Sequence, residues 1–277
     1  MESGLYIVAT PIGNLADLTV RAREVLAAAD LVAAEDTRHT RRLLKHYGID
    51  SRLTAYHEHS DRSVARRLCD RVAAGETVAL VADAGTPLIA DPGYRLVRLA
   101  QARGLPVVPI PGPCALVAAL SAAGLPSDRF RFEGFLPPRA GPRRARLAAL
   151  AGETATLVFY EAPHRVAATL ADLAVCFGDQ REAALVREIS KAFETVRRDR
   201  LDALRDAVTA DADQRRGEIV LLVAGRSDTE IAIDPALGSL ARALAAELPA
   251  KRVATLLAAY SGVRRNRLYA WLLEQRD

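Results

Sequence analysis

DAGTPLIADPG, residues 83–93, follows an apolar run of strand length at 78–82 and precedes a helical pattern at 92–103. Two similar loops, TPIGNL at 10–15 and PGP at 111–113, also follow apolar runs. Open α/β sheets bind ligands beyond the carboxyl ends of their strands, where glycine allows close backbone approach and proline stiffens the turn. Ordinary turns also use these residues, but three such loops in succession favour a ligand crevice.

Short apolar runs alternate with Ala-, Leu- and Arg-rich helical patterns on both sides of this stretch, which predicts an α/β fold with a largely parallel sheet. After a Pro- and Gly-rich segment at 135–146, a second α/β set follows. A linker at 228–235 then leads to a purely helical pattern with breaks at 248–249 and 261–262. We therefore expect an N-terminal α/β domain (1–112), a second α/β domain (113–228) and a small helix-turn-helix-like unit (236–277).

The composition excludes several classes of protein. The 277 residues are 50% hydrophobic and 26% charged, so the chain can bury a core and is not intrinsically disordered. Three cysteines lie far apart, which favours a reducing cytoplasm over a disulfide framework or a zinc cluster. The sequence has neither the pattern of a signal peptide nor an apolar stretch as long as a membrane span, so we expect no membrane attachment. The sequence also lacks four common motifs: GxGxxG of dinucleotide-binding sites after the first strand, the phosphate loop of NTPases, and GxSxG and HExxH of hydrolases.

Five strings in order carry a resemblance: TPIGNLADLTVRA, AAEDTRHTRRLL, DAGTPLIADPG, IPGPCALVAALSAAGLPSDRFRFEGFLP and FYEAPHR. With them the chain resembles bacterial methyltransferases of small-subunit ribosomal RNA, in the tetrapyrrole-methylase-like class of S-adenosylmethionine enzymes. The resemblance implies two α/β domains with S-adenosylmethionine in the cleft between them, and usually a homodimer. It also implies that the substrate is 16S rRNA of the small ribosomal subunit, methylated on the ribose 2′-oxygen of a cytidine in the decoding region.

The resemblance further implies which residues contact the cofactor. Most lie in the three loops or at the start of the helix after the third loop, and the rest belong to the second domain. Carried over position by position, they are Pro11, Asp83, Gly85, Thr86, Ile89, Cys114, Ala115, Tyr160, Arg187 and Glu218.

Acidic and imidazole side chains follow apolar runs at the same expected sheet edge. In methyl transfer from a sulfonium the protein mainly positions the acceptor oxygen, and a general base can help to remove its proton. The candidates for catalysis are Glu35, Asp36, His57 and Lys191. Asp36 could instead cap a helix, His57 could be a surface residue, and Lys191 could meet substrate phosphate or stay solvated. His57 and His59 could also hold a metal, but no third ligand has matching spacing and we expect none.

Arginine outnumbers lysine 35 to 3, although the net charge is only +4. Residues 137–150 contain four arginines and no acid, and residues 249–277 carry +4, the charge of the whole chain. Clustered arginine interleaved with aromatic residues, here Tyr260, Tyr269 and Trp271, can clamp phosphate and stack on unpaired bases. Solvated helix faces and a packed Trp271 would give the same pattern. The RNA-binding candidates are Arg38, Arg139, Arg143, Arg144, Arg264 and Arg265.

Two other functions fit part of the pattern. A tetrapyrrole C-methyltransferase would share the fold, and its anionic substrate would also suit arginine, but the basic tail and the EDTR and HEH segments argue against it. A non-enzymatic RNA-binding or ribosome-assembly protein would need no cofactor crevice, so the intact loops argue against it.

Overall fold

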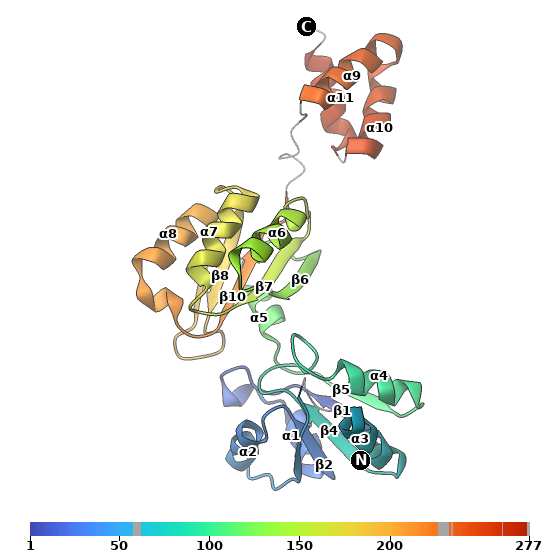
Figure 1. Cartoon of the computed structure of the whole chain (residues 1–277), viewed down its shortest axis with the longest axis vertical. Coiled ribbons are helices and arrows are strands. Elements are labelled where there is room, and N and C mark those ends of the chain that lie inside the picture. Colours follow the sequence, from blue (N-terminus) through green and yellow to red (C-terminus); the bar gives the residue numbers. More distant parts are fainter. Residues whose placement is uncertain (58–61, 227–232, 234, 262, 276–277) are drawn as a thin grey trace.

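The computed structural model describes residues 1–57, 62–226, 233, 235–261 and 263–275. Two α/β units and a three-helix unit follow one another along the chain, and Figure 1 shows them one above the other along the longest axis. Each unit has hydrophobic clusters of its own. The alternation of strands and helices predicted from the sequence is confirmed, whereas the proposed domain boundaries stay predictions.

The first sheet contains five parallel strands. They are β1 (Gly4–Val8), β2 (Leu31–Ala34), β3 (Leu53–Ala55), β4 (Thr77–Val81) and β5 (Val107–Ile110), in the spatial order β3-β2-β4-β1-β5. β2 and β4 are buried along their whole length because helices cover both faces, which is why they read as continuous apolar runs.

Four helices cover this sheet. They are α1 (Val20–Ala28), α2 (Thr37–His46), α3 (Arg62–Ala73) and α4 (Tyr94–Ala102), with a 3-10 turn, η1 (Leu15–Asp17), before α1. Helices α1 and α2 pack on one face and α3 and α4 on the other. The helix expected at 92–103 begins two residues later than predicted, because Gly93 precedes it with a φ of +140° that no helix can contain.

The second sheet is mixed. Its strands are β6 (Phe130–Phe135), β7 (Thr156–Glu161), β8 (Glu182–Arg187), β9 (Thr195–Arg200) and β10 (Ile219–Val223), in the order β6-β7-β10-β8-β9. Only β6 and β7 are parallel, and the other pairs are antiparallel. The sequence interpretation missed β6, because this edge strand interleaves phenylalanine with charged residues and stays partly exposed.

One helix covers the face of the second sheet that is turned toward the first unit, and three cover the opposite face. The single helix is α5 (Ala115–Ala122), and the other three are α6 (Ala140–Leu150), α7 (Val166–Phe177) and α8 (Leu201–Ala210), followed by η2 (Ala212–Arg215).

The C-terminal unit consists of α9 (Pro235–Glu247), α10 (Ala250–Ser261) and α11 (Arg265–Glu274). The predicted break at 248–249 is confirmed, because α9 ends at Glu247 and α10 begins at Ala250. Gly262 of the second predicted break and most of the linker expected at 228–235 lie outside the described residues. Trp271 packs on Gly238 and lies 5.6 Å beneath the guanidinium of Arg242, so it belongs to this unit's own core. In the part of the chain that is described, no helix has the length and apolar character needed to cross a membrane.

Candidate active site

Hydrogen bonds connect three loops at the carboxyl edge of the first sheet. Thr10, after β1, exchanges two backbone hydrogen bonds of 2.9 and 3.0 Å with Gly85, in the loop after β4. Thr86 Oγ1 donates a hydrogen bond of 2.9 Å to the carbonyl oxygen of Pro113, just before α5. The three loops therefore form one continuous rim.

The loop after β4 holds strained backbone. Leu88 and Ala90 have φ of +75° and +65°, a region that residues with a Cβ rarely adopt. Such backbone costs of order 1–3 kcal/mol per residue and is concentrated at ligand sites, where the surroundings hold it in place. The rim is thus shaped at a cost in stability, as expected of a binding loop.

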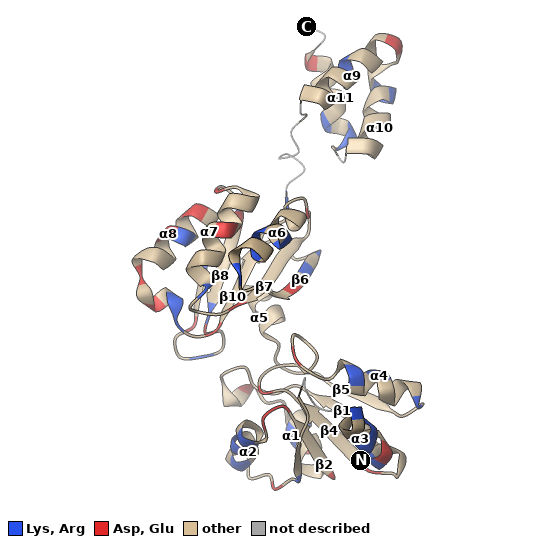
Figure 2. Cartoon of the chain, viewed as in Figure 1, with Lys and Arg blue, Asp and Glu red and all other residues tan. Residues whose placement is uncertain are grey.

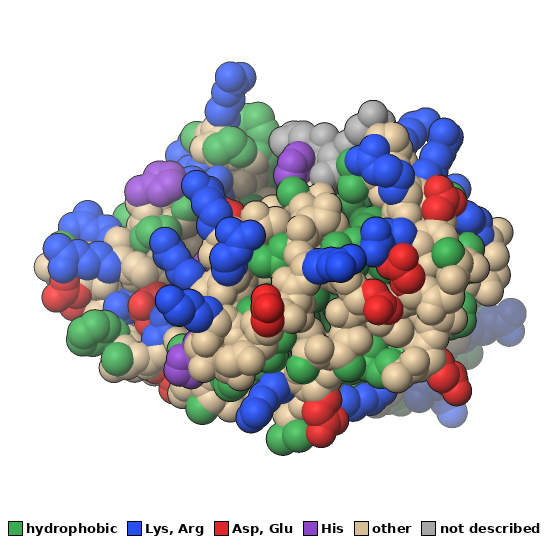
Figure 3. Space-filling view, turned by 90° about the horizontal axis from the view of Figure 1, so that it is seen from below, with side chains coloured by type: hydrophobic (Ala, Val, Ile, Leu, Met, Phe, Trp, Pro, Cys, Tyr) green, Lys and Arg blue, Asp and Glu red, His purple; other side chains and the backbone are tan. Residues whose placement is uncertain are grey.

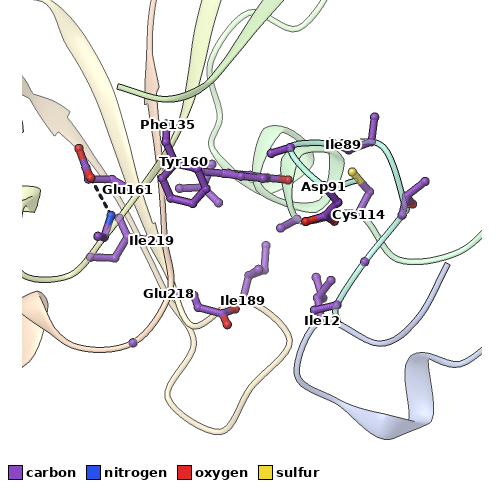
Figure 4. A pocket seen from close by; sticks show the side chains of 18 of the residues that line it. Ile12, Ile89, Asp91, Cys114, Phe135, Tyr160, Glu161, Ile189, Glu218 and Ile219 are labelled. Carbon is purple, nitrogen blue, oxygen red and sulfur yellow. Dashed lines mark hydrogen bonds between the residues drawn. The ribbon is translucent and has the colours of Figure 1, made fainter. Parts of the chain in front are cut away.

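A cavity of about 370 Å³ lies between this rim and the second sheet (Figure 4). That volume is in the range of small-molecule sites. Its lining consists of Ile12, 84–86 and 89–91 from the first unit, Cys114 and Ala115 at the start of α5, and Phe135, 160–163, Ile189 and 217–220 from the second unit.

Tyr160 forms an aromatic wall of this cavity. Its ring makes edge contacts with Phe132 and Phe135, with centroids 4.9 and 5.8 Å apart, and Figure 4 shows it reaching toward Cys114. Its hydroxyl accepts a hydrogen bond of 3.1 Å from the backbone N–H of Leu116. Burial raises the pKa of Tyr160, so the phenol stays neutral. Tyr160 therefore joins β7 to the first turn of α5.

Three carboxylates are close together on the first-unit side. Asp83 accepts a hydrogen bond of 2.9 Å from the backbone of Asp36, and the backbone N–H of Asp83 points to Glu35 at 3.5 Å. Burial, together with the negative charges of Glu35 and Asp83, raises the pKa of Asp91 to about 7. The part of the cavity next to Asp91 is therefore suited to a cationic ligand, whose charge would offset the repulsion among the three carboxylates. Among the described residues, no group of three or more His, Cys, Asp or Glu is placed to hold a metal ion.

A second cavity of about 320 Å³ adjoins the first, and both are lined by Ile12, Ala84 and Glu218. Lys191 enters it from the loop after β8, with Nζ 2.9 Å from Glu188 and 3.1 Å from Glu218. Burial alone would lower the pKa of Lys191, but hydrogen bonds and charges from the two glutamates raise it above its ordinary value. The lysine is thus a permanent cation at neutral pH.

Comparisons with known proteins agree with this geometry. The model of the Tetrapyrrole (Corrin/Porphyrin) Methylases matches residues 4–205, and that of the RsmI C-terminal HTH domain matches residues 231–276. A ribosomal RNA small subunit methyltransferase I from Pseudomonas aeruginosa is 54% identical over 278 residues, with 99% of each chain covered. One from Escherichia coli O157:H7 is 51% identical, covering 99% of this chain and 96% of the relative. The chain belongs to the ribosomal RNA small subunit methyltransferase I family.

A solved structure shares the fold of this methyltransferase. Uroporphyrin-III C-methyl transferase from Thermus thermophilus, complexed with S-adenyl homocysteine, has a TM-score of 0.54 at 21% identity and covers 80% of this chain and 97% of its own. The predicted architecture, two tetrapyrrole-methylase-like α/β units with a C-terminal helical unit, is confirmed.

Most of the predicted cofactor residues surround the two cavities of the methyltransferase. The larger cavity is lined by Gly85, Thr86, Ile89, Cys114, Ala115, Tyr160 and Glu218, and the adjoining one by Pro11, Asp83 and Glu218. Arg187 is the exception. It is buried at the end of β8, and the described lining of neither cavity includes it, although Ile219, its partner on β10, does line the larger one. The sequence-based placement of Arg187 in the cofactor site is therefore not supported.

The catalytic candidates separate in space. Glu35 lies beside the backbone of Asp83, outside the described lining of both cavities, and Lys191 lines the second cavity. Asp36 caps α2 by accepting a hydrogen bond of 2.8 Å from the backbone of Arg38, and bonds from the Arg38 side chain and backbone lower the pKa of Asp36. His57 is exposed after β3, outside the described lining of both cavities, and His59 lies outside the described residues.

Arg143 is not available to RNA. Its side chain is only 6% exposed and lies 2.7 Å from Asp172, which also accepts a 2.6 Å hydrogen bond from Arg144. Burial alone would raise the pKa of Asp172, but these hydrogen bonds hold it below its ordinary value. The prediction that Arg143 binds RNA is wrong for a physical reason: Asp172, 29 residues away, draws it into the core as a structural ion pair.

Removal of Arg143 is expected to destabilise the fold. Arg143→Ala would leave Asp172 largely buried with one partner fewer, so the free energy of unfolding should fall by about 3 kcal/mol. The matched variant Arg144→Ala removes an arginine that is 60% exposed, and should cost less than about 1 kcal/mol. Urea denaturation measures both values, and equal losses would contradict this assignment.

The other RNA candidates are exposed. Arg38 is 83% exposed beside Asp36, and Arg139 precedes α6. Arg264 and Arg265 lie at the start of α11. The structure thus leaves candidates for RNA contact in all three units.

Sequence reasoning missed Asp91, Phe135 and Ile189 as parts of the larger cavity. Asp91 had a signal, because it lies inside the DAGTPLIADPG string. Phe135 lies on the strand that was missed, and Ile189 has no local signal because only the fold brings its loop to the rim.

Proposed function

We propose that this methyltransferase transfers a methyl group from S-adenosylmethionine to the ribose 2′-oxygen of a cytidine in the decoding region of 16S rRNA. The observation that carries the proposal is the cavity between the two α/β units, on a chain 54% identical to a ribosomal RNA small subunit methyltransferase I over nearly its whole length. The exposed arginines of all three units support a polyanionic substrate.

The residues present fit S-adenosylmethionine. The cavity is mostly apolar, with an aromatic wall at Tyr160, and has room for a ligand of this size. Glu35, Asp83 and Asp91 supply negative charge at one end, which suits a ligand with a sulfonium and an ammonium group. Pro11, Gly85, Thr86, Ile89, Cys114, Ala115 and Glu218 would complete the site.

The chain's own residues mainly position the acceptor. The cofactor supplies an activated methyl group, so the protein has to hold the ribose hydroxyl in line and remove water. Glu35 accepts the hydroxyl proton at the rim, and Lys191 provides a fixed positive charge for the acceptor oxygen or an adjacent phosphate. Asp36 orients Arg38, and His57 contacts the substrate from the end of β3. Alanine at Glu35, Asp36, His57 and Lys191 tests these roles, and full turnover of all four variants would disprove them.

The test uses small ribosomal subunits from cells that lack this protein. Incubation with methyl-labelled S-adenosylmethionine, followed by digestion to nucleosides, should place the label in 2′-O-methylcytidine. Label found only in a parallel reaction with uroporphyrinogen would instead support the tetrapyrrole C-methyltransferase. The absence of cofactor binding in calorimetry would support a non-enzymatic RNA-binding protein.

We also infer that the protein acts in the cytoplasm as a homodimer. Three apolar side chains of the second unit are exposed, as an interface between two copies would need: Val117 on α5, Phe193 in the loop before β9, and Val196 on β9, the edge strand. Light scattering coupled to size exclusion measures the oligomeric state, and a monomer at micromolar concentration would refute the dimer.

Asp91 gives a pH-dependent prediction. Its pKa in the folded protein, about 7, lies above the ordinary value of 3.8, so ionisation opposes folding. Without cofactor, stability should therefore fall as the pH rises from about 4 to 7, and Asp91→Asn should remove much of that slope in thermal melts.

Cofactor affinity should change in the opposite direction, because ionised Asp91 attracts a cation. Between pH 6 and 8 the affinity for S-adenosylmethionine should rise about tenfold relative to S-adenosylhomocysteine, which lacks the sulfonium charge. Calorimetry measures the affinity for each ligand. Both ligands carry the same amino-acid part, so its titration does not change the ratio of the two affinities. A constant affinity ratio, or a ratio that still changes in Asp91→Asn, would contradict the prediction.

A further inference from the structure

The exposed face of α2 is entirely basic. The helix buries Thr40, Leu43 and Leu44, of which Leu44 joins the core of the first sheet and Leu43 lines the second cavity, and it contains no acidic residue. Successive residues turn by about 100°, so the exposed positions fall on one continuous arc of about 160° along a helix roughly 15 Å long. We name this arc the α2 basic face; its members are Arg38, His39, Arg41, Arg42, Lys45 and His46.

Most of its charge is not neutralised within the protein. Arg38 pairs with Asp36, but among the described residues no ion pair involves Arg41, Arg42 or Lys45. By contrast, arginines of the second unit such as Arg146 and Arg205 do have carboxylate partners. Unpaired cations packed side by side on one helix repel one another, and an external polyanion would relieve that repulsion.

The α2 basic face leads directly into the candidate active site. His39 and Arg42 line the second cavity together with Asp83 and Lys191. Figure 2 shows the basic residues along α2, and in Figure 3 blue side chains gather on the left of the face seen from below, on the side where Figure 1 places α1 and α2. A strand lying on this face would therefore continue into the cavity that holds Lys191.

We propose that the α2 basic face binds the phosphate backbone of the RNA strand next to the methylated nucleotide. This inference rests on the proposed function and adds the surface on which the substrate lies. Arg38, Arg42 and Lys45 form a row about 10 Å long, directed along the helix axis. Phosphate contacts with such a row fix the position of the RNA strand but do not recognise its base sequence.

The chemistry of the face favours RNA over a protein partner. It is convex and carries no exposed apolar side chain, so it lacks the buried aromatic or aliphatic anchor on which protein interfaces depend. It offers guanidinium and ammonium donors, which suit phosphate oxygens.

The experiment compares two double variants of the full chain. Arg41→Gln/Lys45→Gln removes two charges from the α2 basic face. The control, Arg66→Gln/Arg67→Gln, removes two exposed arginines from α3, on the opposite face of the first sheet. Affinities for unmodified small subunits and for a naked 16S rRNA transcript are measured across a potassium chloride series, with cofactor affinity by calorimetry and methyl incorporation alongside.

The α2 variant should bind both probes about tenfold more weakly at 0.1 M salt, and its slope of log affinity against log salt should fall by about 1.5, since each lost phosphate contact removes 0.7–0.9. Cofactor affinity should be unchanged, and the control should behave as the unaltered protein.

Unchanged slopes, or equal losses in the control, would overturn the proposal. Weaker binding to subunits with unchanged binding to the naked transcript would assign the face to a ribosomal protein and also overturn it. If the unaltered protein transferred no methyl group to subunits, the proposed function would fail, while the salt slopes would still decide what the face binds.

Discussion

Lys191→Met should lower the rate of methyl transfer at saturating substrate by about 10²–10³-fold while lowering cofactor affinity far less. The loss is that expected when one fixed charge aimed at a reacting oxygen is removed. Lys191 is suited to this role because Glu188 and Glu218 hold Nζ in place from two sides. It lines the second cavity, where the proposed cofactor site reaches Pro11, Asp83 and Glu218, but it is absent from the described lining of the larger cavity. The rate should therefore fall far more than the cofactor affinity.

The raised pKa of Lys191 distinguishes between two possible roles, a fixed positive charge and a general base. A general base must lose its proton near the working pH, whereas Lys191 keeps its proton well above neutrality. Lys191→Arg should therefore recover part of the rate, and the rate should show no titration of this lysine between pH 6 and 9. Single-turnover methylation of small subunits measures both. A Lys191→Met variant with weakened cofactor binding and a lowered melting temperature would instead indicate a structural role.

Some of this site was predictable because its parts are contiguous in the sequence. Loops such as 83–93 carry their own signals: the apolar run before them, the glycine and the proline. Strands buried on both faces, such as β4, likewise read as unbroken apolar runs. The rim and the first sheet therefore follow from local patterns.

Other features depend on partners far away in the chain. Arg143 has the local sequence pattern of an exposed arginine, and only its ion pair with Asp172 holds it in the core. Arg187 is likewise buried, in β8 beside β10, although Ile219 opposite it reaches the cavity. Strand direction is also non-local, because the sequence of strands and helices in the second unit does not reveal that most neighbours are antiparallel. Pairing and register decide these features, and no single segment encodes them.

Gly85→Val should weaken S-adenosylmethionine binding at least about 100-fold. Gly85 has a φ of +79°, which is costly for any residue with a Cβ and most of all for a β-branched one. A Cβ at this position would also meet Ile12 Cγ2 at 3.3 Å, tighter than ordinary contact, and Ile12 lines both cavities. Because Gly85 shares two backbone hydrogen bonds with Thr10, any shift of one loop moves the other.

Backbone strain alone must be distinguished from damage to the rim, and Gly104 offers the matched control. It has a φ of +66°, and nothing lies within 4 Å of the Cβ that a substitution would add. Gly104→Val should therefore lose stability through strain, by about 1–2 kcal/mol, yet bind the cofactor normally. Gly85→Val should show the same loss of stability plus the loss of affinity, because its loop is a wall of the cavity. If both variants bound the cofactor equally well in calorimetry, the rim around Gly85 would not be the cofactor site.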